Sequence, residues 1–496
     1  MPAMEPPIFE KGSPGRRGID VVPSSGDPGI APALLREDLE GFPEVGELDV
    51  VRHYTRLSRL NYSAATNFYP LGSCTMKYNP AANERAAALP GFAALHPFAP
   101  EDTVQGALEL MFELERWLAE ISGLAAVSLQ PAAGAQGELT GIKMIRAWHL
   151  ARGDARSKIL IPSSAHGTNP ASAALSGYQA VVVPCDERGV MCADSVRDLL
   201  DEQVAALMVT NPNTLGLFEV EIQEIARSVH EIGGLVYMDG ANMNALMGKA
   251  KPGHMGADVL QFNLHKTFST PHGGGGPGAG PVAVTAALEP YLPAPRIVET
   301  GQQGEGGEGF RWDTNCPKSV GRVRSFHGNF GILVRAYAYM LACGGDGLTE
   351  VTETAVLAAN YLRARLEGAY HLPYDRRSMH EVVFTDKRQQ AFGVKTLDIA
   401  KRLLDYGFHA PTIYFPLVVS GALMIEPTES ESLETLDAFV DAMLEIASDT
   451  ESDPDRVKDA PTATPLARLD ETRAARHPIL VWTQKAGAAV DDAAGR

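Results

Sequence analysis

The sequence predicts an α/β fold built around a mainly parallel sheet. Short apolar runs with β character recur through the middle of the chain, and helical patterns lie between several of them, notably in Ile222–Ile232. The runs are Lys158–Ile161, Ala180–Pro184, Ala205–Thr210, Leu235–Asp239, Asp258–Phe262 and Val282–Thr285. Such alternation is typical of a parallel sheet with helices on both faces. In these sheets ligands bind beyond the carboxyl ends of the strands.

Composition limits the classes of protein that fit. The chain has 496 residues, of which 45% are hydrophobic and 21% charged, as in an ordinary globular protein. The net charge of −18 argues against a general affinity for nucleic acid or anionic lipid. No apolar run approaches the ~18 residues of a membrane span, and no signal peptide is visible, so we expect no membrane association.

The cysteines indicate the compartment. Five cysteines in so long a chain, without a CxxC pair, do not form the framework of a disulfide-stabilised protein. We therefore expect a reducing, cytoplasmic setting. The cysteines are Cys74, Cys185, Cys192, Cys316 and Cys343.

Shifts in composition predict the domain organisation. The first hundred residues are rich in proline and read as an extended arm, with one short helix at Leu34–Leu39. A helix at Asn329–Cys343 leads into a smaller α+β segment, and a Gly/Glu-rich turn region, Gly301–Gly309, precedes it. The predicted parts are an N-terminal arm (1–100), a large cofactor-binding domain (101–328), a small C-terminal domain (329–449) and a loosely packed tail (450–496).

A turn of small residues opens a helix before the first run. Val104–Ile121 has apolar residues at helical spacing and Gly123 as its C-terminal cap. The segment Pro131–Glu138 follows, and a second helix continues to about Arg152. Free N–H groups at such a helix start suit a phosphate. The alternative is a plain tight connection.

Lys266 stands out chemically. It lies in Asn263–Phe268, after an apolar run and before a glycine run, Gly273–Gly278. Partial burial or a cationic neighbour prepares a lysine amine for Schiff-base formation, and glycines let the backbone approach a flat cofactor. We therefore expect Lys266 to hold pyridoxal phosphate (PLP). The alternative is a surface lysine before a flexible loop.

Three further side chains follow strands of the same predicted sheet. Asp239 suits the pyridine nitrogen of PLP, because a carboxylate there keeps the ring protonated. His166 suits stacking on the ring, and Asn211 suits a hydrogen bond to its phenolate oxygen. Taken singly, each of these three residues could instead be an ordinary loop, turn or helix-cap residue without a role in cofactor binding. The phosphate would be bound by Gly134, Ala135, Gln136 and His265.

The amino-acid sequences of several segments also show a family resemblance. Together they resemble the glycine decarboxylase P-protein of the glycine cleavage system, in particular the PLP-bearing second subunit of its two-subunit form. The resemblance implies a fold-type I PLP-dependent transferase, with Lys266, Asp239 and His166 as its catalytic residues. Asn242 departs from many fold-type I enzymes, which have a histidine there. The segments are Asn67–Pro80, Pro131–Glu138, Ser164–Pro170, Thr210–Glu219, Asp239–Asn244, Asn263–Pro277 and Lys318–Arg335.

The resemblance also implies an activity. PLP-dependent decarboxylation of glycine would release CO2 and transfer the aminomethyl group to the lipoyl arm of H-protein. The chain would assemble with the first subunit of the P-protein, in a heterotetramer that contains two copies of each subunit. Arg322 and Arg324 are candidates for the glycine carboxylate, and the loop Ser73–Lys77 for the lipoyl path. The alternatives are another fold-type I enzyme acting on a small amino acid, as a hydroxymethyltransferase or decarboxylase, and a non-catalytic regulatory subunit.

Overall fold

The computed structural model describes residues 4–19, 26, 29–36, 41–272, 278–300 and 309–482. Contacts group the chain into two compact units, one of residues 64–458 and one of residues 1–63 with 459–496. The four-part division expected from the sequence stays a prediction. The glycine run at 273–277 and most of the turn region at 301–309 lie outside the described residues.

The larger unit is organised around a seven-stranded sheet with the order β1-β7-β6-β5-β4-β2-β3. The pairs from β6 through β5, β4 and β2 to β3 are parallel, whereas β7 runs antiparallel to both β6 and β1. The expected mainly parallel sheet is thus confirmed. The strands are β1 (Ala126–Ser128), β2 (Lys158–Pro162), β3 (Gln179–Val183), β4 (Val204–Thr210), β5 (Leu235–Gly240), β6 (Val259–Phe262) and β7 (Val282–Val284).

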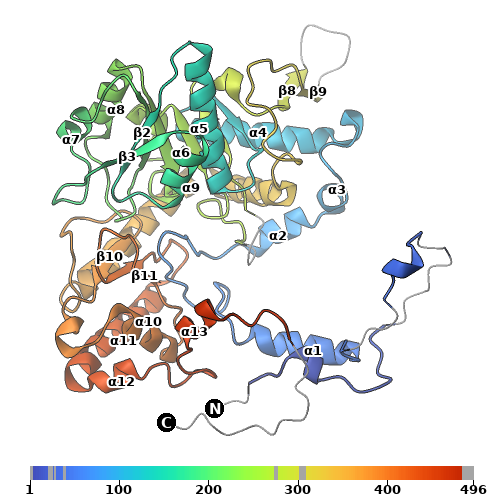
Figure 1. Cartoon of the computed structure of the whole chain (residues 1–496), viewed down its shortest axis with the longest axis vertical. Helices are drawn as coiled ribbons and strands as arrows, with labels where there is room; N and C mark the ends of the chain where they lie inside the picture. The colour runs from blue at the N-terminus through green and yellow to red at the C-terminus, as the bar shows by residue number, and fades with distance from the viewer. Residues whose placement is uncertain are drawn as a thin grey trace. The chain divides into compact units, whose positions relative to one another are not determined.

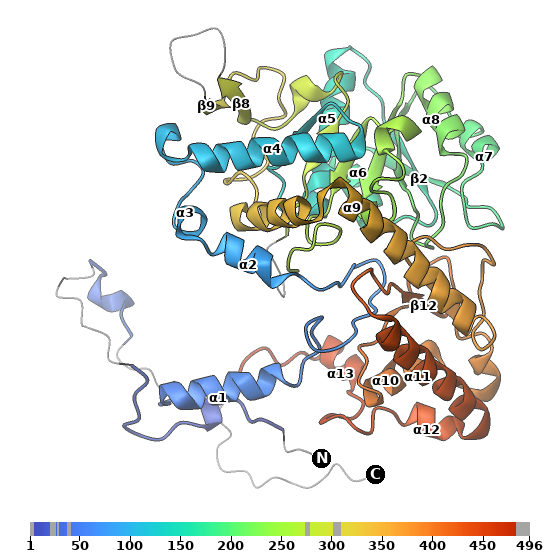
Figure 2. The same ribbon diagram turned by 180° about the vertical axis from the view of Figure 1, so that it is seen from behind.

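Helices cover both faces of this sheet (Figures 1 and 2). Side chains alternate along β5: Tyr237 belongs to a core cluster with residues of α5 (Gly134–Ala151) and α6 (Thr168–Leu175). Val236 and Met238 belong to the cluster on the opposite face. That second face packs against α4 (Gln105–Ser122), α7 (Ala193–Arg197), α8 (Ile222–Glu231) and the first part of α9 (Phe330–Leu366).

The long helix α9 connects two cores. Its first part packs into the large-sheet core through Leu333, and its last part packs through Leu362 into a core beneath a second sheet. The helix predicted to end at Cys343 does so at a kink, because Gly344 has non-helical backbone angles with a φ of 62°, and a second helical part follows to Leu366. The second sheet is antiparallel, with the order β10-β12-β11. Its elements are β10 (Val382–Thr385), α10 (Thr396–Asp405), β11 (Thr412–Ile413), β12 (Ala422–Ile425) and α11 (Leu433–Ser452).

Shorter elements complete the larger unit. A hairpin of β8 and β9 flanks residues 301–308, which are not described. The sequence analysis did not predict either strand, because both are mostly part-exposed and mix polar with apolar residues instead of forming an apolar run. The elements are α2 (Ala81–Ala87), α3 (Pro90–Ala93), η3 (Glu101–Thr103), η4 (Met243–Ala245), η5 (Pro252–Met255), η6 (Glu289–Tyr291), β8 (Arg296–Thr300), β9 (Gly309–Asp313), η7 (Gln389–Phe392) and α12 (Pro454–Lys458).

The smaller unit contains one longer helix, α1 (Glu47–Ser58), with η1 (Ile8–Glu10), η2 (Pro32–Leu34) and α13 (Glu471–Arg476). His53 is buried in it, and its Nδ1 lies 3.1 Å from Oε1 of Glu5. Of the helix predicted at Leu34–Leu39, residues 37–39 lie outside the described part. Among the helices described, none is long and apolar enough to cross a membrane.

Candidate active site

The carboxyl ends of the parallel strands open onto one cavity of about 210 Å³. Parallel strands end at the same edge of a sheet, so polar residues after β2, β4, β5 and β6 converge there. Six of the eight predicted site residues line the cavity. The lining residues are Ser73, Ala133, Gly134, Ala135, Glu138, His166, Thr168, Thr210, Thr214, Asp239, Ala241, Asn242, Asn263, His265 and Lys266.

Lys266 lies in the turn that follows β6. Its backbone N–H donates to the carbonyl of Asn263 at 3.0 Å, and its own carbonyl accepts from Ser269 at 3.3 Å. The turn places the Lys266 side chain at the cavity wall. The amine therefore projects from a hydrogen-bonded turn next to a buried strand.

Asp239 occupies the end of β5 and is 4% exposed. Its Oδ1 accepts hydrogen bonds from the Ala241 N–H, at 2.9 Å, and from the side-chain amide of Gln261. Two donors hold one carboxylate oxygen in place. The carboxylate faces the cavity that Lys266 also lines.

His166 follows β2 on the other side of the cavity. Its Nδ1 lies 2.9 Å from the Thr168 hydroxyl, and that hydroxyl donates to Oε1 of Glu138 at 2.9 Å. Partial burial lowers the pKa of His166, with Lys266 acting in the same direction and Asp239 opposing it. A neutral imidazole results at pH 7, and such a ring can stack on an aromatic ligand.

Helix α5 begins at the cavity with Gly134 and Ala135. An added Cβ at Gly134 would lie 2.1 Å from Oδ1 of Asn263, so a larger residue there would displace the Asn263 side chain from the cavity wall. The third predicted phosphate residue, Gln136, does not line the cavity. Its Oε1 accepts from the Ala132 N–H and its Nε2 donates to the Val323 carbonyl, both at 2.7 Å, so it braces the loop.

His265 lines the cavity beside Lys266. Burial lowers its pKa to about 4, and the nearby His272 and Lys266 add to this effect. A neutral imidazole can donate one hydrogen bond to a phosphate but carries no charge there. Its ring lies 5.3 Å from that of His272.

Asn211 does not line the cavity. Its Oδ1 accepts from the Glu219 N–H at 3.0 Å, and its Nδ2 lies 3.8 Å from the sulfur of Met255. Thr210 and Thr214, on either side of it, line the cavity instead. The side chain of Asn211 thus serves the fold of its own loop.

Glu138 is the cavity residue of most chemical interest that the sequence analysis missed. It is 4% exposed, and burial together with the charge of Asp239 raises its pKa to about 8. Glu138 lies four residues after Gly134 on α5, and this spacing puts both on one helix face. That spacing is the signal by which the sequence could have identified it.

The two candidate carboxylate-binding arginines lie outside the cavity lining. The guanidinium of Arg322 lies 5.2 Å from the ring centre of Phe98. Arg324 donates from Nη1 to Oδ1 of Asn329 at 3.1 Å. The structure gives both arginines partners within the fold.

The cavity fits PLP on several counts. A lysine, an acid and an imidazole face one space, and a helix N-terminus opens beside them. The buried Oγ1 of Thr210 and Oδ1 of Asn263 have no hydrogen-bond partner, although both residues line the cavity. An added Cβ at Gly280 would lie 2.0 Å from the Ala133 carbonyl, so this glycine lets the chain pass close beneath the loop.

Fold and site together define a fold-type I PLP-dependent enzyme. Among solved structures, a P-protein of the glycine cleavage system in inhibitor-bound form has a TM-score of 0.68 at 24% identity, over 84% of this chain and 91% of that one. An aspartate aminotransferase from Thermus thermophilus has a TM-score of 0.58 at 15% identity, over 76% of this chain and 99% of that one. These likenesses concern the fold.

Sequence relatives identify the family. Residues 33–407 match the family model of the glycine cleavage system P-protein, and residues 351–464 match that of the glycine dehydrogenase C-terminal domain. The chain belongs to the glycine cleavage system P-protein family. A probable glycine dehydrogenase (decarboxylating) subunit 2 from Chlorobium chlorochromatii is 57% identical over 95% of this chain and 98% of its own length. The protein of the same name from Bacillus licheniformis is 54% identical over 95% of this chain and 98% of its own length.

Proposed function

We propose that this chain is the PLP-bearing subunit that decarboxylates glycine in a glycine cleavage system. The observation that carries the proposal is the convergence of Lys266, Asp239 and His166 on one cavity. Support also comes from relatives that share more than half of its residues and are named for this reaction. PLP, when bound, would accept the electron pair released as CO2 leaves.

The protein groups would have separate tasks. Lys266 would hold the cofactor covalently and return a proton after glycine has reacted. Asp239, held by two hydrogen-bond donors, would keep the pyridine nitrogen protonated. His166 would cover one face of the ring. Gly134, Ala135 and His265 would receive the phosphate at the start of α5.

We further propose that the aminomethyl group passes to the lipoyl arm of H-protein and that a first P-protein subunit completes the assembly. The name "subunit 2" of the relatives supports a partner subunit. Two copies of each subunit are proposed on the family resemblance. A cytoplasmic setting is supported by cysteines that are all free.

A variant pair tests the lysine assignment. Lys266→Ala should abolish both the absorption band at ~420 nm and the lysine adduct that borohydride reduction traps. Lys249→Gln is the control, because Lys249 forms an ion pair with Glu353 on the surface. Mass spectrometry of the reduced protein then locates the cofactor. A trapped adduct on another lysine would overturn the assignment.

A second assay separates glycine cleavage from other PLP chemistry. Exchange of carboxyl-labelled glycine with CO2 should depend on a lipoylated carrier protein. Exchange that is equally fast without the carrier would favour another decarboxylase. A protein that shows no bound cofactor under any condition would favour a regulatory subunit.

A further inference from the structure

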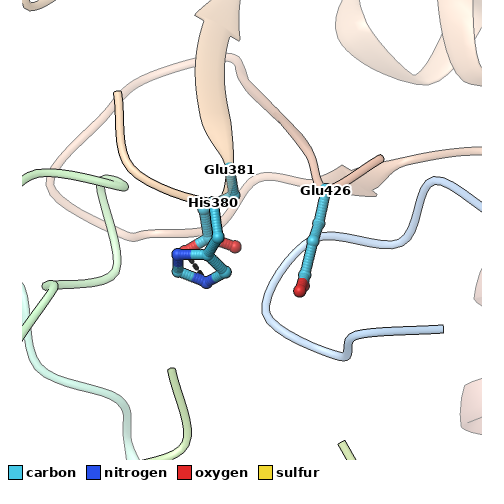
Figure 3. Close-up of side chains that lie close together, drawn as sticks. All are labelled: His380, Glu381 and Glu426. Carbon is cyan, nitrogen blue, oxygen red and sulfur yellow. Dashed lines mark ion pairs between the residues drawn. The ribbon is translucent and has the colours of Figure 1, made fainter. Parts of the chain in front are cut away.

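A buried cluster of three ionisable side chains lies on the smaller sheet, outside the cavity lining. His380, Glu381 and Glu426 each have 0% exposure. One possible ligand atom from each residue, an imidazole nitrogen and two carboxylate oxygens, lies within 4.8 Å of the other two. Figure 3 shows the imidazole and the Glu426 carboxylate projecting from two neighbouring segments towards one space.

Strand pairing explains why the two carboxylates meet. Val382 of β10 pairs with Ile425 of β12 in antiparallel register, so Glu381 and Glu426 are opposite one another one position further along. Like charges directly opposite on a sheet destabilise it, and buried charges require compensation. Among the described residues, no lysine or arginine lies within ion-pair distance of either carboxylate, although the charge of Lys266 acts on both from further away. The nearest basic group is the imidazole of His380, whose Nε2 lies 3.8 Å from Oε1 of Glu381.

Several atoms of this cluster lack a partner. Nδ1 and Nε2 of His380 and Oε1 of Glu381 are buried without a hydrogen bond. The distance of 3.8 Å between His380 Nε2 and Glu381 Oε1 is too long for one. Unsatisfied buried polar atoms are costly, so a group bound among them would remove a considerable penalty.

The carboxylates are held in place by donors from other segments. The Ser73 N–H donates to Oε2 of Glu381 at 2.8 Å. The Thr75 N–H and hydroxyl donate to the two oxygens of Glu426 at 2.9 and 2.6 Å, and Asn244 Nδ2 donates to Oε1 at 3.2 Å. Metal-ligating carboxylates are characteristically fixed by such outer hydrogen bonds.

We propose that His380, Glu381 and Glu426 bind one divalent transition-metal ion, Zn²⁺ or Mn²⁺. An imidazole with two carboxylates suits such ions, and a charge of +2 balances the two carboxylates. Three ligand atoms bound at about 2.0–2.2 Å to one ion lie about 3.3–3.8 Å apart. The three ligand atoms now lie within 4.8 Å of one another, so side-chain rotations that shorten the longest separation by about 1 Å would complete the site.

The ion would fix one wall of the candidate active site. Ser73 lines the cavity and is tied to Glu381, while Thr75 is tied to Glu426. Ser73 and Thr75 have φ values of 62° and 50°, in the left-handed region that non-glycine residues seldom adopt. Such strain persists only where surrounding structure holds it. The ion would thus hold a wall close to Lys266, whose charge acts on all three ligand groups, and its binding can be measured separately from the reaction proposed above.

Metal content of the full-length wild-type chain gives the direct test. The chain, freed of PLP and treated with a chelator, is titrated with Zn²⁺ or Mn²⁺ and measured by calorimetry and elemental analysis. We expect one ion per chain with a dissociation constant below about 10 μM and a rise in melting temperature. Wild-type chain that binds neither ion at this stoichiometry overturns the proposal, whatever the variants do.

Variants then locate the ion. His380→Gln, Glu381→Gln and Glu426→Gln should each weaken binding at least a hundredfold, and Thr75→Val, which removes only an outer hydrogen bond, about tenfold. His327→Gln is the matched control, because His327 is also buried, at 4% exposure, and has both ring nitrogens without a hydrogen bond, near Arg322. Loss of the ion in the control but not in the three ligand variants also overturns the proposal. Circular dichroism establishes that each variant is folded.

Discussion

Gln261 donates a hydrogen bond from its side-chain amide to Oδ1 of Asp239 and accepts one from the hydroxyl of Tyr237. Gln261 and Asp239 are directly paired on the parallel strands β6 and β5. All three side chains are buried. The acid proposed for the pyridine nitrogen is therefore positioned by a chain of hydrogen bonds inside the sheet.

This relationship predicts the effect of Gln261→Leu. Removing the amide leaves a buried carboxylate oxygen with one donor fewer, at a cost of about 1–3 kcal/mol. Because Asp239 is then less well held, PLP should bind about tenfold more weakly in a spectroscopic titration. Gln223→Leu is the control, since Gln223 is exposed and its side-chain amide donates to the His254 carbonyl, away from the cavity lining. Equal affinities in the two variants would contradict the positioning role.

Asp239→Asn tests the acid itself. The amide keeps the shape of the side chain but cannot hold a proton on the pyridine nitrogen. Glycine exchange should fall by about 10²–10⁴-fold, the usual range for a positioned ionisable group, while borohydride still traps the cofactor on Lys266. The measurement combines the exchange assay with mass spectrometry. Near-normal exchange in this variant would exclude Asp239 from the chemistry.

The sequence predicted the strands that meet at the cavity, because their apolar runs are short and bounded. It could not predict which residue of Thr210–Thr214 faces the cavity. That choice depends on where β4 ends and on the bond that Asn211 makes with the Glu219 backbone. The cluster with Glu381 and Glu426 depends on the pairing of two distant strands, so no local pattern reveals it. Local sequence patterns thus predict helices and strands, whereas the pairing of distant strands determines which side chains come into contact.

Glu138 should make the stability of the PLP-free chain depend on pH. Its carboxyl keeps a proton up to a pKa of about 8 when folded, chiefly because of burial and then of Asp239, whereas the unfolded group ionises above about 4.5. The unfolded chain thus binds fewer protons between these values, so stability falls as pH rises. Glu138→Gln should lessen this fall between pH 5 and pH 8 by about 1–3 kcal/mol in urea unfolding. An unchanged pH slope would show that Glu138 is already ionised in the folded chain.

Lys77 is predicted to hold the N-terminal segment of the larger unit in place. Its ammonium group is buried and donates to Oε1 of Glu429 at 2.5 Å and to the Thr267 carbonyl at 2.7 Å. Lys77→Met leaves the Glu429 charge without its partner, so the free energy of unfolding should fall by about 3–5 kcal/mol. Lys249→Met, which breaks an exposed ion pair with Glu353, should cost less than about 1 kcal/mol.

Urea unfolding of both variants and of Lys77→Met/Glu429→Gln measures the difference. Neutralising Glu429 removes the unpaired charge, so the double variant should recover part of the stability that Lys77→Met loses. Similar losses for the Lys77 and Lys249 variants would mean that water reaches the buried pair. In that case the loop from Ser73 to Lys77 would be open to solvent, as a passage for a lipoyl arm requires, and Lys77 would belong to that passage rather than to the fold.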